Sequence, residues 1–75
     1  MNILLFAQLA ERFGARQLSV PHMTDTDTLT HHLNNTCSGF EKEVYMIAVD
    51  KNIVHENTPL NEHSIVALLP PFSGG

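Results

Sequence analysis

The sequence has no tryptophan, one cysteine (Cys37) and few charged residues, which make up 16% of its 75 positions. A single cysteine cannot form an internal disulfide, so a reducing, cytoplasmic setting is expected. No apolar run approaches the roughly 20 residues that a membrane-spanning helix requires. The first residues lack the basic region of a signal peptide and soon reach Glu11 and Arg12. We therefore expect a cytoplasmic protein that does not enter a membrane.

Positive charge is scarce as well, because four lysines and arginines stand against eight acidic residues and give a net charge of −4. Proteins that hold nucleic acid carry basic patches, and helices that bind anionic lipid are rich in lysine. The charge balance therefore argues against nucleic acid and membrane surfaces as partners. The fraction of charged residues, 16%, is also below the roughly 25% usual in globular proteins. This shortage indicates that part of the surface is buried in an interface with another protein.

The apolar pattern predicts one α+β domain over residues 1–75, without repeats or linkers. A short helical turn over 9–13 is expected to stop at Gly14. The main helix is expected between the cap-forming residues 24–28 and Gly39, with a narrow apolar stripe of Leu29, Leu33 and Cys37. Predicted strands span residues 3–7, 16–20, 44–49, 53–54 and 64–69.

One helix with a narrow stripe covers only one face of such a sheet. The first and last predicted strands are nevertheless apolar at consecutive positions, which is typical of strands buried on both faces. A partner protein is the natural cover for the second face, although loops and the short helical turn are the alternative. We place Phe6 and Leu68 as candidate residues at this partner interface.

The sequence ends in Pro70, Pro71, Phe72, Ser73, Gly74 and Gly75. The two prolines lack an N–H donor, so the last strand should stop before them and residues 70–75 should project. Such an extended arm reaches almost 20 Å at about 3.1 Å per residue. Glycine has no Cβ, so the end of the arm suits a narrow channel in another protein. Because the arm holds no Lys, His or Cys to activate a carboxylate, partners must supply the chemistry, and Gly75 is the candidate attachment point for a cargo.

Motifs along the whole chain resemble one known family. They are Leu5-Phe6-Ala7-Gln8 with Glu11 and Gly14, Ile47-Ala48-Val49-Asp50, Pro59-Leu60, and Val66 with Leu68-Leu69-Pro70-Pro71 and Ser73-Gly74-Gly75. This set resembles the MoaD-like sulfur carriers, the small subunits of molybdopterin synthase. The resemblance implies a ubiquitin-like β-grasp fold, with a mixed sheet of about four to five strands and one main helix on one face.

The resemblance also implies a function and its partners. An E1-like adenylating enzyme uses ATP to adenylate the terminal glycine, here Gly75, and a sulfur donor enzyme converts the adenylate to a thiocarboxylate. The arm then enters the large subunit of molybdopterin synthase, where the sulfur passes to the cyclic pyranopterin monophosphate and builds the dithiolene of molybdopterin. Gly74 would provide clearance, and residues 70–73 would line the threaded arm. The chain itself would be a non-catalytic subunit that binds no cofactor beyond these covalent forms of Gly75.

Three other functions remain open at this point. The chain could serve thiamine thiazole synthesis or another sulfur-transfer route, it could be a ubiquitin-like modifier joined to lysines through Gly75, or it could be a plain binding module with an inert tail. A metal site is not expected, because the five histidines and Cys37 show no zinc-type spacing. The adjacent His31 and His32 point about 100° apart on a helix and cannot hold one ion together.

Overall fold

The computed structural model describes residues 1–36, 39–42 and 44–71. The elements along the chain are β1 (Asn2–Leu5), α1 (Gln8–Phe13), β2 (Gln17–Ser19), α2 (Thr26–Thr36), the 3-10 helix η1 (Phe40–Lys42), β3 (Met46–Val49), β4 (Asn52–Val54) and β5 (Val66–Leu69). The strands form one five-stranded sheet in the order β2-β1-β5-β3-β4. β1 and β5 are parallel and every other neighbouring pair is antiparallel, so the expected α+β fold with a mixed sheet is confirmed.

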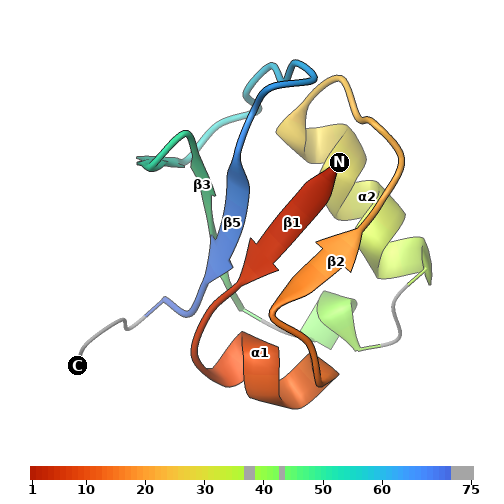
Figure 1. The fold of residues 1–75 in the computed structure, drawn as a ribbon, viewed down its shortest axis with the longest axis vertical. Helices are drawn as coiled ribbons and strands as arrows, with labels where there is room; N and C mark the ends of the chain where they lie inside the picture. Colours follow the sequence, from red (N-terminus) through yellow and green to blue (C-terminus); the bar gives the residue numbers. More distant parts are fainter. Residues whose placement is uncertain (37–38, 43, 72–75) are drawn as a thin grey trace.

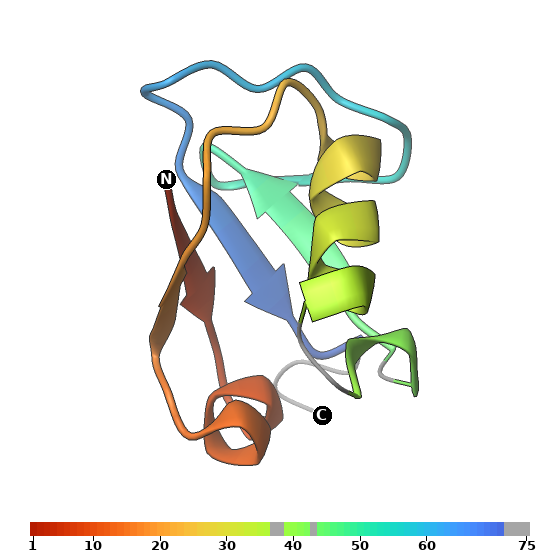
Figure 2. The same ribbon diagram turned by 90° about the vertical axis from the view of Figure 1, so that its right-hand side faces the viewer.

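α2 packs along one face of the sheet, and Figure 2 shows the opposite face without a helix. Strand register assigns side chains to faces, because residues directly opposite each other point the same way. Ile3, Val66 and Val49 lie in one row across β1, β5 and β3. They share a buried core with Leu29 and Leu33 of α2, which are fully buried.

The first turn of α2 is fixed by side chains on both sides of it. Asp25 Oδ1 accepts the backbone N–H of Thr28 at 2.8 Å, and Asn57 Oδ1 accepts that of Asp27 at 2.9 Å. These oxygens satisfy donors that have no partner within the helix. The hydrogen bonds from Thr28 lower the pKa of Asp25, because they favour its charged form. The expected start of the helix within the cap-forming segment 24–28 is therefore confirmed.

A tight turn carries the chain from β1 into α1. Leu9 donates its N–H to the carbonyl of Phe6 at 3.1 Å, and Ala7 between them has φ 52° and ψ −125°. These angles belong to the first central position of a type II′ turn, which glycine normally occupies. α1 then ends at Gly14, which has the left-handed φ of 67° expected of a helix stop.

The strands are shorter than the sequence pattern suggests. The predicted strand over 44–49 begins at Met46, and the one over 64–69 begins at Val66. Ser64 instead closes a turn, since its hydroxyl accepts the N–H of Asn61 at 2.9 Å. β2 pairs with β1 as the expected edge hairpin, with Ile3 opposite Leu18.

Candidate functional site

β5 leads the chain out of the middle of the sheet, as Figure 1 shows. It lies between β1 and β3, and it ends at Leu69, directly before the half-buried Pro70 and Pro71. Because β1 and β5 are parallel, the end of β1 lies beside this exit. The N–H of Phe6 donates to the carbonyl of Leu68 at 3.2 Å. Phe6 therefore flanks the point where residues 70 and 71 leave the sheet.

The face of the sheet opposite α2 is apolar around this exit. We define the outer sheet face by its residues on the four strands β1, β5, β3 and β4, which the register places side by side: Leu4, Ala67, Leu69, Met46, Ala48 and Ile53. Most of these side chains are only partly buried, and Ile53 is 46% exposed. Phe6 continues the alternation of β1 onto this face and is 45% exposed. None of these residues carries a charge, so the face suits an apolar partner surface.

The structure separates the two residues that the sequence placed at a partner interface. Phe6 is exposed at the outer sheet face, and its place at a partner interface stays a prediction. Leu68 is fully buried and belongs to the core beneath α2, so its assignment to a partner interface is wrong. The reason is the period of two along a strand, which turns Leu68 toward the helix and its neighbours Ala67 and Leu69 away from it.

The remaining predicted site residues fall partly outside the described part of the chain. Phe72, Ser73, Gly74 and Gly75 are not among the described residues, and neither is Cys37 of the expected helical stripe. Their predicted roles remain predictions. Sequence reasoning did not identify Met46 and Ile53, since their place on the outer sheet face follows from the pairing of β3 with β4 and β5. The alternation of side chains along each strand indicates that every second residue shares a face, but the pairing register is needed to tell which of the two faces lies away from α2.

Ionisable side chains are spread over the described surface. His31 Nε2 lies 2.9 Å from Asn35 Nδ2 on α2, and His63 lies 3.7 Å from Glu62 in a turn. Within residues 1–36, 39–42 and 44–71, no three His, Cys, Asp or Glu side chains gather as metal ligands. Among the residues that the structure describes, no helix is both long enough and apolar enough to span a membrane.

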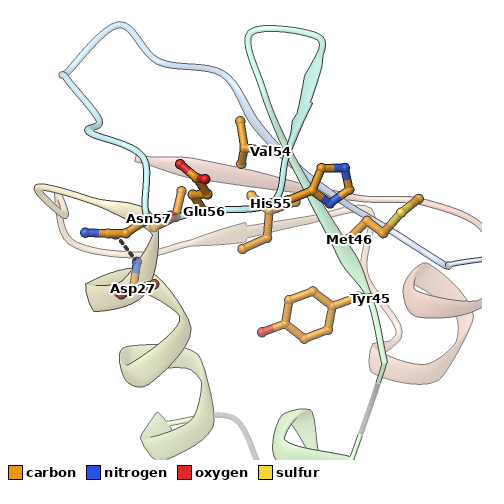
Figure 3. A pocket seen from close by; sticks show the side chains of 9 residues that line it. Asp27, Tyr45, Met46, Val54, His55, Glu56 and Asn57 are labelled. Carbon is orange, nitrogen blue, oxygen red and sulfur yellow. Dashed lines mark hydrogen bonds between the residues drawn. The ribbon is translucent and has the colours of Figure 1, made fainter.

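A second feature that the sequence did not reveal is a hollow of about 300 Å³ on the helix side, shown in Figure 3. Residues from the start of α2, from β3 and from the segment after β4 line it. The ring of Tyr45 lies at one end with its hydroxyl directed toward α2. Burial raises the pKa of Tyr45, and a hydrogen bond with Thr30 opposes that shift in part.

Comparisons with known proteins agree with this geometry. The sequence profile of the ThiS family matches residues 3–75. A chain from the complex of subunits 1 and 2 of the molybdopterin-converting factor of Helicobacter pylori 26695 aligns with a TM-score of 0.75 and 23% identity, over 99% of this chain and 96% of that one. SAMP1 from Haloferax volcanii aligns with a TM-score of 0.64 and 26% identity, over 99% of this chain and 97% of that one. No curated protein sequence gives a significant match.

Proposed function

The chain belongs to the ThiS family of ubiquitin-like sulfur carriers, and from this premise we propose that it is the small subunit of molybdopterin synthase. The structural likeness to a chain of the two-subunit molybdopterin-converting factor supports this choice of pathway. In this proposal the chain works in the cytoplasm, and its partners are the large subunit of the synthase, an E1-like adenylating enzyme and a sulfur donor enzyme.

The carrier chemistry takes place at the carboxylate of Gly75. ATP supplies AMP to that carboxylate and releases pyrophosphate, because a free carboxylate is a poor electrophile. Sulfur delivered by the donor at the level of sulfide attacks the acyl carbon, displaces AMP and gives up its proton, which leaves a thiocarboxylate. In the large subunit, the sulfur passes to the cyclic pyranopterin monophosphate, and an oxygen from water restores the carboxylate. This chain contributes the acyl group and the arm 70–75 that delivers it.

The observation that carries the proposal is the position of the arm's base. β5 leaves from the centre of the sheet next to an uncharged apolar face, with Phe6 and Leu69 at the exit. A partner that covers the outer sheet face therefore sits where the arm begins. Docking of the outer sheet face and entry of the arm can then occur in one complex.

A native pull-down combined with intact mass measurement tests the proposal. The tag belongs at the N-terminus, so that Gly75 stays free. The amine of Met1 donates to the carbonyl of Val20 at 2.6 Å, and an amide N–H at a tagged Met1 can still donate there. We expect recovery of a molybdopterin synthase large subunit and a mass in which sulfur replaces one oxygen.

Other outcomes of the same experiment separate the alternatives. The sulfur-containing mass together with a thiazole synthase would assign the carrier to thiamine synthesis. High-mass conjugates that depend on Gly75 would indicate a protein modifier. An unmodified mass with none of these partners would contradict the carrier function in every form.

A further inference from the structure

The hollow on the helix side opens where β4 separates from β3. β4 pairs with β3 only from Asn52 to Val54, and the chain then turns away through His55 toward the start of α2. The residues that line the hollow are Thr26, Asp27, Tyr45, Met46, Ile47, Val54, His55, Glu56 and Asn57. β4 is also the last strand at this side of the sheet. The hollow therefore lies at an open edge.

Hairpin geometry determines which backbone groups face that edge. The loop between β3 and β4 has two residues, so the flanking Val49 and Asn52 form a hydrogen-bonded pair. Backbone groups along β3 then point alternately toward β4 and toward β5. Asp50 agrees with this alternation, because its N–H donates to Ile65 on the β5 side at 2.8 Å. If this alternation continues to Tyr45, the N–H and C=O of Tyr45 point to the β4 side of β3, at a position beyond the last pair of β3 with β4.

No strand of the described residues takes that position. The register of β3 with β4 ends at the pair of Ile47 and Val54, and no other described strand pairs on that side of β3. Unpaired backbone groups at a sheet edge are a template for another extended chain. The lining of the hollow offers the apolar side chains of Ile47 and Val54 to such a segment.

The charge of the lining selects the kind of segment. Asp27 and Glu56 are exposed on the rim, and no lysine or arginine is among the lining residues. The other ionisable side chains that line the hollow are those of His55 and Tyr45. A segment with a lysine or arginine beside the two carboxylates would complement this charge, whereas an acidic segment would meet repulsion.

We propose that this hollow binds an extended, basic segment of a partner protein, which adds a strand beside Tyr45 and sets a lysine or arginine next to Asp27 and Glu56. Met46 belongs to both the hollow and the outer sheet face, whereas the other residues of that face lie on the opposite side of the sheet, so the two surfaces can be occupied together. The chain could in this way remain bound to one protein through the hollow while a second protein acts on its C-terminal carboxylate. The proposal does not depend on which pathway the arm serves.

Amide chemical shifts of the full chain test this proposal directly. The probe is a short, acetylated and amidated peptide of alternating valine and lysine. We expect its addition to shift the amides of Tyr45, Val54 and His55. A matched peptide with glutamate in place of lysine should leave them unchanged, and a single blocked lysine without neighbours should not reproduce the effect because it cannot pair as a strand.

Two double variants locate the charge. Asp27→Asn with Glu56→Gln should weaken the lysine peptide about tenfold at low salt. Glu11→Gln with Glu62→Gln changes the net charge equally at exposed acids outside the hollow, and should bind as the unaltered chain does. The proposal is overturned if no shifts appear at millimolar peptide, if they map to the outer sheet face, if the glutamate peptide binds equally well, or if the two double variants lose affinity alike.

Discussion

Asp50 and Ile65 form a two-way contact that joins the β3–β4 turn to the approach to β5. The Asp50 N–H donates to the carbonyl of Ile65 at 2.8 Å, and Asp50 Oδ1 accepts the Ile65 N–H at 2.9 Å. Asp50 also has a left-handed φ of 51°, which aspartate and asparagine tolerate better than most residues. One side chain therefore combines a turn conformation with a contact between distant segments.

Replacement of Asp50 tests this contact. Asp50→Ala should lower the free energy of unfolding by about 1–2 kcal/mol, because it removes an acceptor and places alanine at a positive φ. Asp50→Asn keeps an acceptor oxygen and should cost less than half as much. Urea unfolding of both variants provides the comparison, with the exposed Glu62→Ala as a control. Equal losses for alanine and asparagine would contradict the role of the oxygen.

Ala7 occupies a backbone position that favours glycine, at φ 52°. Its side chain is exposed, so Ala7→Gly removes strain without a loss of packing. We expect an increase of about 1 kcal/mol in the free energy of unfolding. The control is Ala10→Gly inside α1, where the same substitution should destabilise. Thermal or urea unfolding that gave the same sign for both would argue against strain at Ala7.

Phe6 and Leu68 should separate binding from folding. Leu68→Ala opens a cavity in the core and should cost about 3 kcal/mol of stability, while Leu68→Glu should prevent folding. Phe6→Glu should leave the fold intact and abolish recovery of the large-subunit partner, because it introduces a charge at an uncharged face. Circular dichroism monitors the fold, and the pull-down monitors the complex. A folded Phe6→Glu chain that still bound the partner would exclude this residue from the contact.

Removal of Gly74 and Gly75 addresses the arm alone. We expect complete loss of sulfur loading with an unchanged urea midpoint, because the core residues all precede Pro70. A control that replaces Glu62 with glutamine should load sulfur as the full chain does. Activity that survives the truncation would contradict the carrier function.

Asp25 should contribute to the acid sensitivity of the fold. Its pKa lies below the ordinary 3.8 because Thr28 donates to its carboxylate. A depressed pKa means that the stabilisation is complete above the unfolded-state pKa and is lost as the pH falls through the folded-state value. Asp25→Asn should therefore flatten the fall in the urea midpoint below about pH 4. An unchanged pH profile would assign the acid sensitivity to other carboxylates.

The sequence predicted the elements well where short-range chemistry controls them. The cap-forming residues around Asp25, the left-handed stop at Gly14 and the end of the last strand before Pro70 all act within a few residues of their own positions. Element lengths were less predictable. The apolar run over 44–49 reads as a longer strand than β3, since composition does not reveal that Val44 and Tyr45 lie outside the pairing.

Composition, apolar pattern and short-range signals were enough to predict a small α+β domain whose last strand ends before Pro70 and whose sheet has one apolar face that the main helix does not cover. Which residues form that face depends on strand pairing, which the folded chain alone reveals. Register turned Leu68 into the core and placed Met46 and Ile53 outside it, because a shift of one residue along a strand exchanges its two faces. The open edge beside Tyr45 likewise exists because β4 leaves β3 at Val54, where segments distant in sequence meet around the hollow.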